Sequence, residues 1–122
     1  MTKEVRLPGS DHPITIEPAP SRIVVRAGKS VVAETARALV LHEATYPGVF
    51  YIPLADIDLT LLRHTNTSTY CPYKGDCSYY TVPMPEGDLV DAAWTYHDPY
   101  PAVTSIVDHV AFYPDRVEIA TE

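Results

Sequence analysis

The stretch 69–80, with the sequence TYCPYKGDCSYY, concentrates the side chains that could do chemistry. It combines two cysteines, a lysine, an aspartate and four tyrosines. Pro72 restricts one backbone angle and Gly75 permits positive φ, so we expect a loop of defined shape that can aim side chains. A cation at Lys74 would favour the thiolate of Cys71. Cys71 and Lys74 are therefore the candidate catalytic residues.

A purely structural role explains the same stretch. Cys71 would then be a small core residue, and Lys74 would pair with Asp76. Lys74 is conspicuous because residues 38–115 contain ten acids and only two bases. It either neutralises a buried carboxylate, with Asp76 as the first choice, or contacts an anionic ligand. We expect the ligand-binding role.

Aromatic residues near this loop suggest a ligand pocket. Trp94 and Tyr96 share one strand face, and with Tyr73 or Tyr79 they could form its wall. A buried aromatic core would also explain these residues. The candidate ligand-binding residues are Tyr70, Cys71, Tyr73, Lys74, Asp76, Tyr79, Trp94 and Tyr96.

The sequence predicts no metal site and no cofactor. The two cysteines lack the Cys-x-x-Cys spacing of zinc and redox sites. The histidines do not fall at metal-ligand spacing; they are His12, His42, His64, His97 and His109. His64 and His109 are the candidates for a base beside Cys71.

Charge and hydropathy exclude two classes of partner. The net charge is −7, and no cluster of Lys or Arg offsets it, so we expect no nucleic acid partner. No apolar run approaches the roughly 20 residues of a membrane helix, so we expect no membrane partner. The first residues lack the apolar stretch of a signal peptide, which favours a cytoplasmic location.

The element pattern predicts a mainly β protein: a compact single domain of antiparallel sheets with one or two short helices. Twelve prolines divide the chain into short pieces. Strands are expected at residues 13–20, 22–26, 49–52, 78–82, 92–96, 110–113 and 117–119, and short helices at 56–62 and 101–108. The last two strands should form a closing hairpin. Residues 1–12 read as an N-terminal extension and 13–120 as the β domain.

Residues 31–43 fit two patterns. Val32, Ala36, Leu39 and Val40 form a helical stripe, and the composition favours helix. Alternation fits equally well. Because the run follows a tight Gly turn at 27–30, we favour one long strand with a bulge.

Four motifs in order resemble the domain-of-unknown-function family 427, sometimes labelled nucleotidyltransferase-like. They are Cys71-Pro72-Tyr73-Lys74-Gly75, Ser78-Tyr79-Tyr80, Trp94-Thr95-Tyr96-His97-Asp98-Pro99 and Val110-Ala111-Phe112-Tyr113-Pro114. The resemblance covers roughly residues 13–120. It implies a compact domain similar to the β-tent fold of methionine sulfoxide reductase B and the cereblon drug-binding domain. It also implies that Cys77 is not half of a functional cysteine pair, because the family usually has a small residue there.

The nucleotidyltransferase label is the weaker alternative. Asp56 and Asp58 have the spacing of a two-metal carboxylate pair. The Gly-Ser element that should precede them is missing, since Gly48 is followed by Val49. A solvated turn explains the two acids better.

Two hypotheses of function remain from the sequence. The first is a small-molecule-binding domain or enzyme whose pocket is lined by Cys71, Tyr73, Lys74 and Trp94. In this hypothesis Lys74 contacts an anionic group of the ligand. The second is a non-catalytic protein-interaction module. A pocket converging on Lys74 favours the first, and a flat apolar patch with Lys74 in solvent favours the second. The sequence leaves the reaction and the oligomeric state open.

Overall fold

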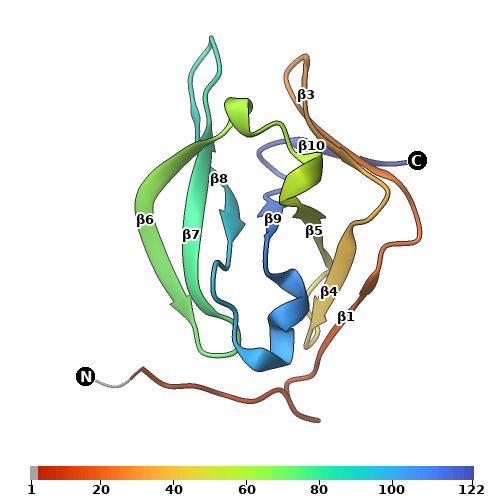
Figure 1. The fold of residues 1–122 in the computed structure, drawn as a ribbon, viewed down its shortest axis with the longest axis vertical. Coiled ribbons are helices and arrows are strands. Elements are labelled where there is room, and N and C mark those ends of the chain that lie inside the picture. Colours follow the sequence, from red (N-terminus) through yellow and green to blue (C-terminus); the bar gives the residue numbers. More distant parts are fainter. Residues whose placement is uncertain (1–2) are drawn as a thin grey trace.

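The computed structural model describes residues 3–122, which form two antiparallel sheets (Figure 1). The larger sheet has the strand order β1-β4-β5-β9-β8-β7-β6, and the smaller has the order β10-β2-β3. The strands are β1 (Ile14–Pro18), β2 (Ile23–Ala27), β3 (Ser30–Thr35), β4 (Leu39–Glu43), β5 (Val49–Pro53), β6 (Arg63–Cys71), β7 (Gly75–Val82), β8 (Leu89–Thr95), β9 (His109–Phe112) and β10 (Glu118–Thr121). The predicted mainly β class is confirmed.

Residues 31–43 are extended, as predicted, but they form two strands instead of one. β3 ends at Thr35 and belongs to the small sheet, whereas β4 begins at Leu39 and belongs to the large one. The Thr35 hydroxyl accepts a hydrogen bond from the Arg37 amide at 2.9 Å and donates one to Asp56 at 2.6 Å. This local side-chain bond competes with the strand ladder and turns the chain from one sheet to the other.

The predicted closing hairpin is wrong. β9 pairs with β5 and β8 in the large sheet, and β10 pairs with β2 in the small one. The turn at 114–116 does form, because the amides of Arg116 and Val117 both donate to the Tyr113 carbonyl. It sends the chain to the other sheet, where Ile119 lies opposite Val25.

β6 was not predicted, because its sequence RHTNTSTYC shows no apolar alternation. It lies at the edge of the large sheet and pairs only with β7, and most of its residues are exposed. Thr65 and Thr67 instead donate hydrogen bonds to Asp91, at 2.8 and 2.7 Å.

The two predicted helical regions contain short 3-10 turns. They are η1 (Leu54–Asp56), η2 (Leu59–Leu61) and η3 (Pro101–Ile106). Asp58 caps η2 by accepting a hydrogen bond from the Thr60 amide.

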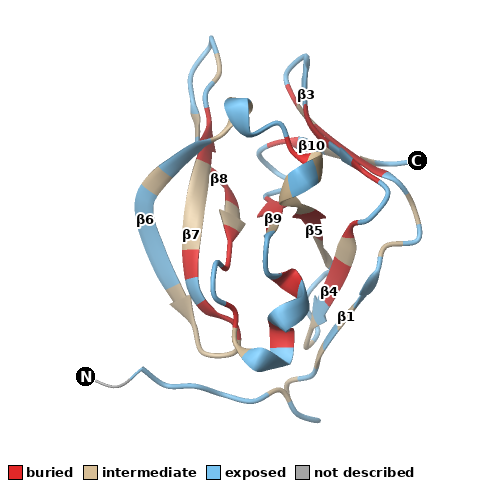
Figure 2. Cartoon of the chain, viewed as in Figure 1, coloured by how far each residue is buried: buried red, intermediate tan, exposed pale blue. Residues whose placement is uncertain are grey.

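Buried residues lie on strands of both sheets and in η3 (Figure 2), and they form two clusters, one on each side of the large sheet. Successive strand residues point to opposite faces. On one face, Ile52 and Val110 pack with residues of the small sheet such as Ile23. On the other face, Tyr51 and Ala111 belong to a second cluster with η3. The candidate site is built on this second face.

Candidate functional site

The loop after β6 is a tight turn that matches the predicted geometry. The Lys74 amide donates to the Cys71 carbonyl at 3.2 Å, and the Lys74 carbonyl accepts from the Tyr100 amide at 3.0 Å. Gly75 has φ +112°, and a Cβ there would lie 3.3 Å from the Asp98 carbonyl oxygen. Two features therefore favour glycine at position 75: its positive φ, and the close approach of the backbone at Asp98. The expected loop of defined shape is confirmed.

Lys74 is buried, with only 8% of its surface exposed, and its ammonium group pairs with Glu43 at the end of β4. The prediction that Lys74 pairs with Asp76 is wrong. Asp76 is exposed and pairs with Lys3 near the N-terminus. Lys74 and Glu43 are 31 positions apart in the chain and meet only because the two halves of the large sheet face each other.

Glu43 has a second partner, His12. Its carboxylate accepts a hydrogen bond from His12 Nε2 at 2.8 Å, and the His12 ring stacks on Tyr73 with centroids 4.0 Å apart. Burial raises the pKa of Glu43. The hydrogen bonds and charges of Lys74 and His12 outweigh that effect and hold the pKa below its usual value. Glu43 is therefore an ionised carboxylate between two donors.

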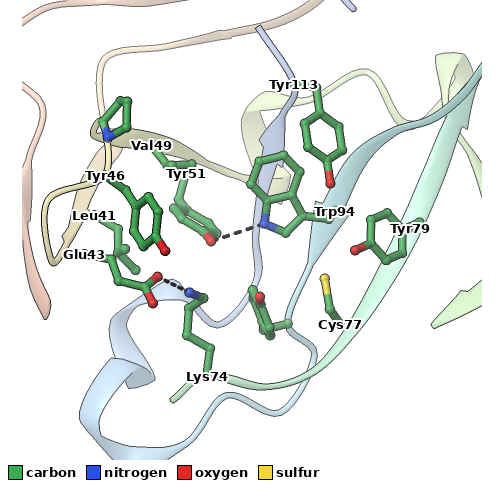
Figure 3. A pocket seen from close by; sticks show the side chains of 12 residues that line it. Leu41, Glu43, Tyr46, Val49, Tyr51, Lys74, Cys77, Tyr79, Trp94 and Tyr113 are labelled. Carbon is green, nitrogen blue, oxygen red and sulfur yellow. Dashed lines mark hydrogen bonds and ion pairs between the residues drawn. The ribbon is translucent and has the colours of Figure 1, made fainter. Parts of the chain in front are cut away.

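A pocket of about 300 Å³ opens beside the Lys74–Glu43 pair (Figure 3), and we call it the Lys74 pocket. Most of its lining residues lie on β4, β5, β7 and β8, and the rest lie in nearby loops. Within a strand the lining residues alternate, because every second side chain faces the same side of the sheet. The lining residues are Leu41, Glu43, Tyr46, Pro47, Val49, Tyr51, Lys74, Cys77, Tyr79, Trp94, Tyr96 and Tyr113.

The aromatic wall depends on a small residue beneath it. Trp94 lies opposite Ala111 on β9 and opposite Tyr79 on β7. Because Ala111 has no bulk, the rings of Tyr51 and Trp94 meet over β9, and the indole Nε1 donates to the Tyr51 hydroxyl at 3.3 Å. The Tyr113 ring lies 4.4 Å from that of Trp94. Figure 3 shows these side chains converging on one space.

The pocket offers hydrogen-bond donors and no activated nucleophile. Burial raises the pKa of Tyr51 and of Tyr96, and it raises the pKa of Tyr79 to about 12. Burial also raises the pKa of Cys77, so its sulfur is a thiol at neutral pH and a weak nucleophile. The three phenols stay protonated and can donate hydrogen bonds.

The pocket brings together half of the predicted ligand-binding residues: Lys74, Tyr79, Trp94 and Tyr96. The other four lie outside its lining. Tyr73 stacks on His12, and Asp76 faces solvent. The Tyr70 hydroxyl shares a 2.6 Å hydrogen bond with that of Tyr100, and Cys71 packs at the margin of the second core cluster.

Sequence reasoning missed Glu43, Tyr51, Tyr46 and Tyr113. For Glu43 a signal was present. It has the same strand parity as Leu39 and Leu41, so an acid stands on the apolar face of a strand, which marks a buried carboxylate that needs a partner.

The remaining candidates lie away from the pocket. Asp56 accepts hydrogen bonds from Thr35 and Arg37, and Asp58 accepts them from the amide and hydroxyl of Thr60. His64 lies 6.1 Å from His97, and His109 bonds to the Val107 carbonyl. Within residues 3–122, no three His, Cys, Asp or Glu side chains cluster closely enough to hold a metal ion.

The same part of the chain contains no helix long and apolar enough to span a membrane. A comparison with curated proteins gave no match. A family model described as Domain of unknown function (DUF427) matches residues 15–122, which is most of the chain. This match confirms the resemblance read from the four motifs. The protein belongs to the DUF427 family.

Proposed function

We propose that this protein binds a small molecule in the Lys74 pocket. The observation that carries the proposal is the position of the buried Lys74–Glu43 pair in the wall of a pocket lined by six aromatic rings. Concave sites with apolar walls and a few convergent polar groups are typical of small-molecule binding. The volume of about 300 Å³ suits a compact ligand.

The ion pair defines the polar group of the ligand. The charge of Glu43 balances that of Lys74, so an anion gains little from Lys74 alone. A neutral group that accepts from Lys74 and donates to Glu43 matches both partners. An amide or a hydroxyl does this, and the Tyr51 hydroxyl supplies a further donor. We therefore favour a neutral polar group over the anionic one expected from the sequence.

Two observations favour binding over the alternatives. Lys74 lies in a concave pocket and not in solvent, which argues against a flat protein-interaction surface. Cys77 is a protonated thiol, and Asp56 and Asp58 already hold structural hydrogen bonds, so the proposal assigns no reaction and uses no nucleotidyltransferase chemistry. The cytoplasmic location stays an expectation from the sequence.

Three matched probes test the proposal: butyramide, butyrate and butylammonium. Binding is followed by the fluorescence of Trp94, the only tryptophan, and by NMR shifts of its indole N–H. We expect butyramide to bind most tightly of the three. Its affinity should fall at least tenfold in the Lys74→Met/Glu43→Leu double variant, because both hydrogen-bonding partners are then lost.

The control is Lys29→Met, which removes an exposed lysine from the β2–β3 turn. It should leave butyramide binding unchanged. Tighter binding of butyrate would show that the site prefers an anion. Absence of binding by all three probes, or equal binding by wild type and the double variant, would contradict the proposed function.

A further inference from the structure

A second pocket of about 440 Å³ adjoins the Lys74 pocket. Ten residues line it and none of them is charged. Phe50, Phe112, Pro114 and Ile119 belong to this pocket and not to the first. We call it the apolar pocket. Its lining suits an uncharged hydrocarbon group.

The apolar pocket lies where two central strands separate. β5 and β9 are joined by only two residue pairs, Ile52–Val110 and Pro53–His109. Toward Val49 and Phe112 the two strands are no longer paired. Residues from both faces of the large sheet therefore reach this space: Phe50 and Phe112 from the face toward the small sheet, and Trp94 from the face of the Lys74 pocket.

The two pockets share part of their lining. Five residues line both of them, and they are Tyr46, Pro47, Val49, Trp94 and Tyr113. Tyr46 is 66% exposed and Tyr113 is 36% exposed, so two of the five shared residues are not locked into the core, whereas Val49 and Trp94 pack against it. Movement of the Tyr46 and Tyr113 side chains would join the two pockets without displacing a fully buried residue.

We propose that the ligand is an elongated amphipathic molecule, with its neutral polar head at Lys74 and Glu43 and an alkyl or aryl tail in the apolar pocket. This inference rests on the proposed function and adds the chemical class of the ligand. The polarity supports it, because the only charged residues that line either pocket are Lys74 and Glu43, at the end away from the tail.

A homologous series of primary amides, from propionamide to decanamide, tests the inference through the gain per methylene. We expect the affinity to rise about fourfold for each methylene that becomes buried, and to level off when the apolar pocket is full. The emission of Trp94 should report every member of the series, because its indole lines both pockets.

Two variants place a charge in the apolar pocket: Ile119→Glu, at a half-buried position, and Pro114→Glu, at an exposed one. The matched control is Thr121→Glu, which is exposed on the same strand as Ile119 and lines neither pocket. Thermal melts identify any variant that fails to fold, and Pro114→Glu keeps the test available if Ile119→Glu does. In folded variants the gain per methylene should fall toward onefold, with propionamide binding unchanged, whereas Thr121→Glu should behave as wild type.

The two proposals fail in different ways. If propionamide binds but longer amides gain nothing, or if the gain persists in both charged variants, the elongated ligand is wrong and the proposed function stands. If no amide of the series binds, both proposals are wrong.

Discussion

Lys74 and Glu43 carry opposite charges, and both side chains are largely buried, with exposures of 10% and 18%. Removing one member of such a pair leaves the other as a buried charge without its partner, which is costly. Removing both leaves no buried charge. The pair is therefore a structural element as well as the polar end of the proposed site. The two roles can be separated by comparing stability with binding.

At the residue scale, we predict that Lys74→Met lowers the free energy of unfolding by about 3 kcal/mol, because Glu43 keeps only His12 as a partner. Lys74→Met/Glu43→Leu should lie within about 1 kcal/mol of wild type, since no buried charge is left over. Urea denaturation of the wild type, both single variants and the double variant measures the coupling. Additive effects would show that the pair is not coupled.

Glu43 also predicts a pH dependence of stability. Its pKa is lower in the folded protein than its usual value of 4.5. The stabilisation is therefore complete above the unfolded-state pKa and is lost as the pH falls through the folded-state pKa. The stability advantage of wild type over Glu43→Gln should be constant near neutral pH and shrink below about pH 4.5. Denaturation of both proteins between pH 7 and pH 3 tests this, and a constant difference would contradict it.

At the scale of elements, the turn that joins β6 to β7 places Lys74, and the turn depends on Gly75. We predict that Gly75→Ala lowers the free energy of unfolding by about 1–3 kcal/mol, since alanine is strained at φ +112° and its Cβ would crowd the Asp98 carbonyl. Thermal or urea denaturation measures the cost.

Gly87 supplies the matched control for this turn. It also has a positive φ, +135°, but a Cβ there would meet nothing within 4 Å. Gly87→Ala therefore carries the dihedral strain without the backbone contact, and it should cost less than Gly75→Ala. Equal costs would mean that the approach of residue 98 to the turn does not matter.

At the scale of the whole molecule, the two faces of the large sheet have different surroundings. One face packs against the small sheet and forms a closed core, and the other carries the pocket. The N-terminal segment lies outside the DUF427 match and runs along the end of the molecule where β6 and β7 turn (Figure 1). The Arg6 amide donates to the Pro72 carbonyl at 2.9 Å, and His12 contacts both Tyr73 and Glu43.

We predict that deletion of residues 1–12 keeps the fold but loosens the Lys74 turn. Hydrogen exchange should become faster across residues 71–76 and stay unchanged at the centre of the large sheet, near Ile52 and Val110. The free energy of unfolding should fall by about 1–2 kcal/mol, through the lost hydrogen bonds. His12→Ala should reproduce most of the loss, because the His12 contacts are partly buried.

Asp76→Ala is the control for the exposed part of this segment. It removes the ion pair with Lys3, in which both side chains are more than half exposed. Exposed pairs contribute little, so its effect should stay within about 0.5 kcal/mol. If Asp76→Ala destabilises as much as His12→Ala, the segment is held by its surface charges and not by the contacts of His12 with Glu43 and Tyr73.

The sequence by itself determined the features that depend on local chemistry. Alternating β-branched and aromatic residues indicated a mainly β protein, because the alternation that marks a strand lies within the strand's own sequence. Pro72 and Gly75 indicated the turn in the same way, and the four short motifs identified the family. Half of the predicted ligand-binding residues line the pocket, since Lys74 lies in that turn, Tyr79 follows it on β7, and Trp94 and Tyr96 share a face.

The tertiary structure alone decided which distant residues meet. The choice of Glu43 over Asp76 as the partner of Lys74 depends on how β4 faces β7 across the large sheet, and no local pattern encodes that approach. The same holds for β9 and β10, which look like a hairpin in the sequence but join different sheets, and for β6, whose polar edge strand has no apolar alternation to reveal it. Strand pairing is set by burial of apolar faces over the whole chain, so a pocket made from four strands exists only once their order and register are formed.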